Sequence, residues 1–75
     1  MKIDALIKMA NQIADFFEGE GGRQEAIPLM AAHLRRYWEP RMREQIIEHY
    51  QNQGGAGLGE VALGSVALLA QGKPY

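Results

Sequence analysis

The sequence predicts an all-α protein, a small bundle of three to four short helices with a proline-broken turn between the second and third. Three observations support this fold class. Apolar residues recur at helical spacing through the first two thirds of the chain, and glycines or prolines separate these runs. The chain has 75 residues, which allows one domain at most.

The first predicted helix covers about residues 3–18. Its apolar positions follow the i, i+3, i+4, i+7 spacing of an amphipathic helix: Ile3, Leu6, Ile7, Ala10, Ile13, Ala14 and Phe17. The glycine-rich run EGEGG at 18–22 ends it, because glycine accepts the left-handed conformation that a helix C-terminus often requires.

Two further helices are expected at about 25–38 and 40–51. Pro28 is expected in the first turn of the second helix, where its missing N–H has no intrahelical acceptor to lose. Pro40 disfavours helical geometry at Glu39, so the second helix should end there and the third should begin with Pro40. The third helix should turn its apolar residues inward: Met42, Ile46, Ile47 and Tyr50.

We therefore expect a helical domain at 1–53, followed at 54–75 by a glycine-rich linker and an apolar, partly helical C-terminal segment. Between residues 58 and 70, Glu60 and Ser65 are the polar side chains. A helix that is apolar nearly all round is normally buried all round. Because three short helices are not expected to bury a fourth on every side, we expect this segment to pack on another chain or to be poorly ordered alone.

Composition excludes several classes of function. The absence of cysteine excludes disulfides, thiolate metal sites and a thiol nucleophile. A net charge of −1 gives no field that would draw the chain to nucleic acid or to an anionic membrane. The apolar stretch 61–70 would span roughly 15 Å as a helix, about half the hydrocarbon thickness of a bilayer. Asp4 and Lys8 interrupt any N-terminal signal, so we expect a cytoplasmic protein with no membrane contact.

The sequence offers no convincing catalytic or cofactor site. His33 and His49 lie on different predicted helices, and their surroundings do not match metal-binding motifs. The glycine run 52–59 lacks the lysine and hydroxyl residue of a phosphate-binding loop and is better explained as a linker. We expect no enzyme activity, no metal and no cofactor.

The most unusual stretch is HLRRYWEPRMREQ at 33–45, which holds the single tryptophan and four of the eight basic residues. A solvated face with local pairs such as Arg41 and Glu44 would explain part of it. However, Arg41 and Arg43 fall in a first helical turn, where the helix dipole disfavours positive charge. Arginine beside aromatic residues is typical of interface hot spots. We therefore predict a partner-binding patch: His33, Arg35, Arg36, Tyr37, Trp38, Pro40, Arg41, Met42 and Arg43. Whether Trp38 faces the core or a partner stays open.

Two alternatives remain. Helices joined at a proline turn with arginines could form a helix-turn-helix that reads DNA, although Glu44 and Glu48 would face the phosphates. A self-associating helical protein, a homo-oligomer without other partners, would also explain the excess apolar surface.

Three blocks resemble the delta subunit of NAD-dependent formate dehydrogenase: LIKMANQIADFF (6–17), HLRRYWEPRMR (33–43) and GGAGL (54–58). The second block is the most specific, because helical periodicity does not produce a His-x-Arg-x-aromatic-Trp-x-Pro-Arg-Met pattern. Met9, Ala10 and Asn11 carry the match in the first block.

The resemblance implies a small helical accessory subunit that does no chemistry itself. In that family the larger subunits hold the molybdenum or tungsten cofactor, iron–sulfur clusters and flavin, and they oxidise formate with NAD as acceptor. The delta chain would support assembly or stability of the complex by docking on the larger subunits, with the catalytic one as its expected partner.

Overall fold

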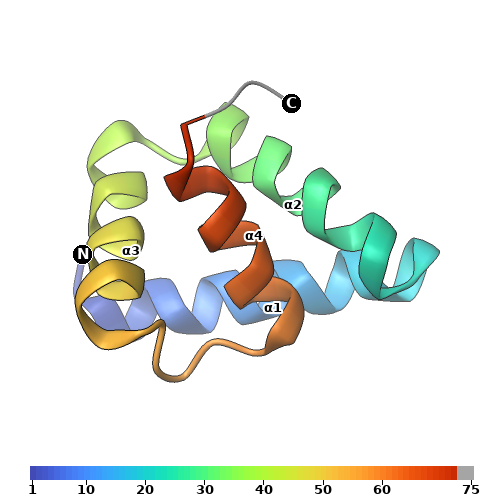
Figure 1. Cartoon of the computed structure of the whole chain (residues 1–75), viewed down its shortest axis with the longest axis horizontal. Coiled ribbons are helices and arrows are strands. Elements are labelled where there is room, and N and C mark those ends of the chain that lie inside the picture. Colours follow the sequence, from blue (N-terminus) through green and yellow to red (C-terminus); the bar gives the residue numbers. More distant parts are fainter. Residues whose placement is uncertain (73–75) are drawn as a thin grey trace.

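The computed structural model describes residues 1–72 and contains four α-helices within them. These are α1 (Ile3–Gly21), α2 (Arg23–Tyr37), α3 (Pro40–Gln53) and α4 (Glu60–Ala70) (Figure 1). The described residues contain no β-strand, so the predicted all-α class is confirmed.

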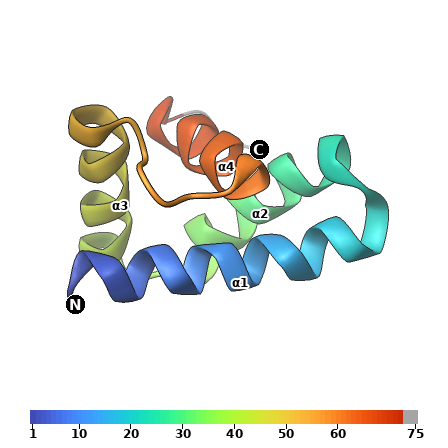
Figure 2. The same cartoon turned by 90° about the horizontal axis from the view of Figure 1, so that it is seen from below.

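The first three helices form a frame around the fourth. Figure 1 shows α1, α2 and α3 along three sides with α4 between them, and Figure 2 shows α3 rising from the N-terminal end of α1. α4 contacts all three of the other helices, and α2 also packs along α1. The core therefore lies where the four helices meet, with α4 at its centre.

The ends of α1 and α2 differ from the prediction. α1 continues to Gly21, and Gly22 (φ 90°) ends it while donating its N–H to the Glu18 carbonyl over 3.1 Å. α2 starts directly afterwards at Arg23. Pro28 therefore lies beyond the first turn of α2, whereas the sequence predicted it within that turn. Pro28 and Gln24 are both exposed. Pro28 has no N–H to donate to the Gln24 carbonyl, which therefore lacks its usual hydrogen-bond donor within the helix. Because Gln24 is exposed, this carbonyl belongs to a residue that water can reach.

The proline-broken turn between α2 and α3 is confirmed. Trp38 (φ −79°, ψ 139°) and Glu39 (φ −63°, ψ 151°) have extended backbones, and Pro40 opens α3. An extended conformation before proline is the expected one, because the proline ring clashes with a helical residue in front of it. Two residues thus turn the chain from one helix into the next.

The expectation that α4 needs another chain to cover it is wrong. From 61 to 70 every residue is buried or half-buried within this chain, and Ala62, Ser65 and Val66 are fully buried. Small residues explain how three short helices achieve this. A Cβ on Gly64 would lie 2.8 Å from Ile27 Cδ1, so the absence of a side chain lets α4 approach α2 closely.

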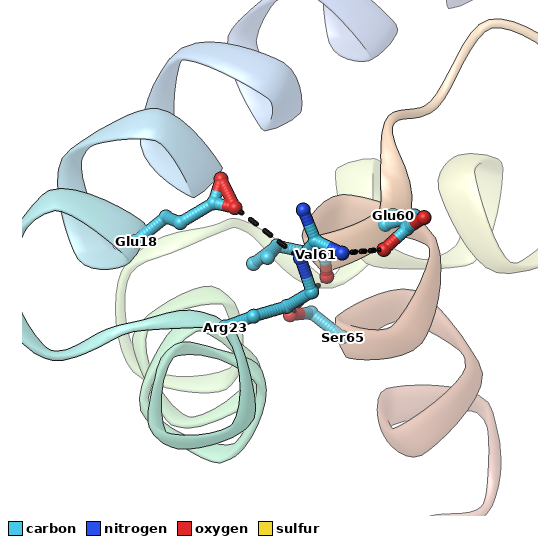
Figure 3. A network of polar contacts seen from close by, with 5 residues as sticks. All are labelled: Glu18, Arg23, Glu60, Val61 and Ser65. Atoms are coloured by element: carbon cyan, nitrogen blue, oxygen red, sulfur yellow. Dashed lines mark hydrogen bonds and ion pairs between the residues drawn. The ribbon is translucent and has the colours of Figure 1, made fainter.

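The two polar residues of α4 are both held by α2. Ser65 Oγ is buried and lies 2.7 Å from the Val61 carbonyl and 3.2 Å from the Ile27 carbonyl, either of which accepts its hydrogen. Arg23, the first residue of α2, forms ion pairs with Glu18 of α1 and Glu60 of α4 (Figure 3). All three ion-pairing side chains are well exposed, so these pairs contribute little to stability.

The loop between α3 and α4 is fixed by one side chain of α1. Asn11 Nδ2 donates to the Gly57 carbonyl over 2.9 Å, and Asn11 Oδ1 accepts from the Gly59 N–H over 2.9 Å. The amide therefore satisfies two backbone groups of the loop. Its place in the most recognisable part of the first sequence block now has a structural reason.

The glycines at 54 and 55 provide a matched test of the packing. Both have positive φ, 66° and 73°, but a Cβ on Gly54 would meet open space whereas one on Gly55 would overlap the side chain of Leu63. We expect Gly54→Ala to lower the free energy of unfolding by about 1 kcal/mol, the penalty for a left-handed conformation. Gly55→Ala should cost at least about 1 kcal/mol more because of overpacking. Urea unfolding measures both, and equal losses would contradict the close approach of Leu63.

Asn11→Asp keeps the shape of the side chain but removes its donor. An ionised carboxylate would still accept from the Gly59 N–H, while its second oxygen would face the Gly57 carbonyl. We expect a loss of about 1–2 kcal/mol in unfolding free energy at pH 7. The folded state should raise the pKa of the introduced carboxyl, since its protonated form can donate to Gly57. The deficit relative to the wild type should therefore shrink as the pH falls through this raised pKa, and should be smallest below about pH 4, the ordinary pKa of a free aspartate. A deficit that is constant with pH would refute this clamp.

Candidate partner-binding surface

Trp38 belongs to the core in the described structure. Its side chain is 6% exposed and it joins the buried cluster that includes Leu34, Ile46 and Val66. The question left open by the sequence is thus answered for this chain: the tryptophan stabilises the corner between α2 and α3. It does not offer a surface to a partner in this conformation.

The arginines of the predicted patch divide into two groups. Arg43 Nη1 donates to the Arg35 carbonyl oxygen, which ties the first turn of α3 to the end of α2. Arg35 and Arg43 are half-buried at that corner. Arg36 and Arg41 are exposed, and neither forms an ion pair with any residue in the described range 1–72. Those two are the cations that stay available to another molecule.

The other members of the patch are also separated. Pro40 is exposed at the start of α3, and Met42 is half-buried against the core. His33 and Tyr37 lie one turn apart on α2, and Tyr37 is 65% exposed. The structure thus does not gather the nine predicted residues into one surface. It brings His33, Arg36 and Tyr37 together on α2.

Through His33, these three residues are connected to aromatic side chains of α1. The ring of His33 lies 5.6 Å from that of Phe17 and 4.8 Å from that of Tyr37, measured between centroids. Phe16 lies 5.3 Å from Phe17 in an edge-on arrangement, and the Arg36 guanidinium lies 5.6 Å from the Tyr37 centroid. We call Phe16, Phe17, His33 and Tyr37 the aromatic face. It crosses from α1 to α2 on the outside of the bundle.

A groove runs beside the aromatic face. It has a volume of about 350 Å³ and is lined, without any charged side chain, by Met9, Gln12, Ile13, Phe16, Phe17 and His33. Phe16, on its rim, is 63% exposed. Large aromatic side chains bury 150–250 Å² each when they are covered, so two exposed rings beside an apolar groove offer a substantial contact area.

Sequence reasoning missed the contribution of α1 to this surface. The signal was the pair Phe16 and Phe17, because neighbouring residues on a helix point about 100° apart and one apolar stripe cannot bury both. Phe17 was expected inside and is half-buried against the core, whereas Phe16 is exposed. Ile13 was likewise expected on the inward apolar stripe, and it also lines the groove, as does Met9, which carries the resemblance in the first sequence block.

Within the described residues there is no group of three or more histidine, cysteine, aspartate or glutamate side chains that could hold a metal ion. No helix in the same range is both long and apolar enough to cross a membrane. The groups present at the aromatic face and its groove are apolar side chains, aromatic rings and the Arg36 guanidinium.

A comparison with known protein families gives one match. A family model described as the NADH-dependent formate dehydrogenase delta subunit, FdsD, matches residues 5–66, which is most of the chain. No curated protein matches, and no solved structure matches. The match spans all of the aromatic face and its groove.

The neighbours Trp38 and Tyr37 should respond very differently to truncation. Trp38→Ala removes a buried ring and should lower the free energy of unfolding by about 3–5 kcal/mol. Tyr37→Ala removes an exposed ring and should cost less than about 1 kcal/mol. Thermal and urea unfolding followed by circular dichroism test this pair. Similar losses for the two variants would show that Trp38 is not part of the core.

Proposed function

Because the chain belongs to the NADH-dependent formate dehydrogenase delta subunit family, we propose that it is a non-catalytic accessory subunit of such a complex. It supports the assembly or stability of the cytoplasmic enzyme by docking on the larger subunits, with the catalytic subunit as the main partner. The larger subunits carry the cofactors and the chemistry, and this chain supplies a binding surface.

The observation that carries this proposal is the aromatic face. A small domain whose core is already complete has no structural use for Phe16 and Tyr37 at 63% and 65% exposure. Exposed aromatic residues next to arginine are typical of binding hot spots, where a few such side chains provide most of the affinity. The core does not need a partner to cover α4, so the partner is expected at this surface.

A DNA-binding role has less support. The net charge is −1, and the turn that joins α2 to α3 holds Arg35 and Arg43 in contact with each other through the Arg35 carbonyl. Phosphate contacts by basic side chains provide most of the affinity for DNA. α3 would have to approach the duplex with Glu44 and Glu48 on its exposed surface.

The proposal predicts that the larger subunits depend on this chain. In cells that lack it, we expect several-fold less intact formate dehydrogenase complex and less formate oxidation, both restored by the wild-type gene. Affinity purification of a tagged larger subunit, followed by quantification of each subunit, measures this. If intact and fully active complex accumulates normally without the chain, the accessory role is refuted.

The same strains separate assembly from stability. If the chain acts in assembly, complex formed without it should be scarce but should lose activity at the normal rate on warming. If it acts in stability, the complex should form normally and then lose activity faster. Wild-type chain that fails to co-purify with any larger subunit would contradict docking altogether.

A further inference from the structure

The groove beside the aromatic face has a defined polarity. Its lining carries no formal charge, but the charged residues beyond its two ends differ in sign. Glu20 lies one turn beyond Phe16 on α1, and Glu25 lies two turns before His33 on α2. Arg36 lies at the other end, next to Tyr37. One end of the surface is therefore acidic and the other is basic.

The basic end is prepared for a carboxylate. Arg36 is exposed, forms no ion pair within the described part of the chain, and lies over the Tyr37 ring. A guanidinium can stack on an aromatic ring and at the same time donate two parallel hydrogen bonds from its N–H groups to a carboxylate. Within the described residues no carboxylate forms an ion pair with Arg36, which leaves its guanidinium accessible to a carboxylate of a partner.

The groove is suited to the apolar face of a helix. It is bordered by five side chains of α1 and by His33 of α2, it is open to solvent, and its polar side chains are Gln12 and His33. Helices that bind in such grooves insert apolar side chains spaced at i, i+3 and i+4. The family match makes this chain a subunit of a larger complex, which favours a segment of another subunit over a second copy of this chain as the occupant.

Resting on the proposed function, we propose that the groove between α1 and α2 binds one amphipathic helical segment of a larger subunit. The apolar side chains of that segment fill the space between Met9, Ile13 and Phe17. An aspartate or glutamate of the segment pairs with Arg36, and its opposite end, next to Glu20 and Glu25, is neutral or basic. The charges of the two ends thus fix the direction in which the segment lies, because the reversed orientation would place like charges together.

Photo-crosslinking in the assembled complex tests the occupant. A benzoylphenylalanine at Phe16 reports on the groove, and the same probe at Gln51, exposed on α3, serves as the control. We expect the Phe16 probe to capture one peptide of a larger subunit with apolar residues at helical spacing and an acid within about one turn of them. Capture of another copy of this chain would instead identify a homo-oligomer, and capture of a peptide without an acid would overturn the charge assignment.

Charge reversal tests the direction. Arg36→Glu should weaken retention of this chain in the complex by at least about tenfold, as expected for a paired interface charge. Gln51→Glu combined with Asn52→Asp makes the same change in net charge at exposed positions of α3 outside the groove, and should alter retention by less than about twofold. Reversing the captured acid to arginine should restore binding to the Arg36→Glu variant.

The outcomes distinguish this inference from the proposed function. If wild-type chain co-purifies with the larger subunits but the Phe16 probe captures nothing, the subunit role stands and the groove is refuted. If Arg36→Glu and the Gln51→Glu, Asn52→Asp double variant weaken retention equally, the pairing with a carboxylate is refuted. Circular dichroism of each variant confirms that the fold is intact, which is expected because all the substituted side chains are exposed.

Discussion

The burial of α4 is the constraint on which the rest of this structure depends. An eleven-residue helix that is almost entirely apolar must be enclosed, and α1, α2 and α3 are arranged as a frame that encloses it. Close approach is achieved by small residues, most clearly where Gly64 meets Ile27. The loop leading into α4 is then held by the Asn11 amide, so the polypeptide returns to the centre of the bundle along a defined path.

Enclosing α4 also determines which side chains remain outside. Trp38 is drawn into the corner between α2 and α3, and Arg43 secures that corner by its hydrogen bond to the Arg35 carbonyl. Within residues 1–72 no further helix covers Phe16 and Tyr37 on the outer side of α1 and α2, and both side chains are exposed there. Two adjacent residues of one sequence block therefore have different roles: Trp38 stabilises the fold, and Tyr37 is available for binding.

Helix periodicity and the prolines were sufficient to predict the all-α class and the turn at Pro40, because both follow from local backbone chemistry. The position of α4 could not be predicted in this way, since its burial depends on how closely small residues such as Gly64 allow two helices to approach. Only part of the candidate surface was visible in the sequence. The block 33–43 contains Tyr37 and Arg36 and so indicated part of the surface. Phe16 lies far from them in the sequence, and only tertiary packing, through Phe17 and His33, brings it to the same surface.

Hydroxyl-radical footprinting of the isolated chain and of the intact complex distinguishes core from interface, because it reports on single aromatic side chains. We expect Phe16 and Tyr37 to be labelled strongly in the isolated chain and protected in the complex, whereas Trp38 should be labelled weakly in both. Strong labelling of Trp38 in the isolated chain, lost on assembly while Phe16 and Tyr37 stay unchanged, would instead place the tryptophan in the interface and Phe16 and Tyr37 outside it.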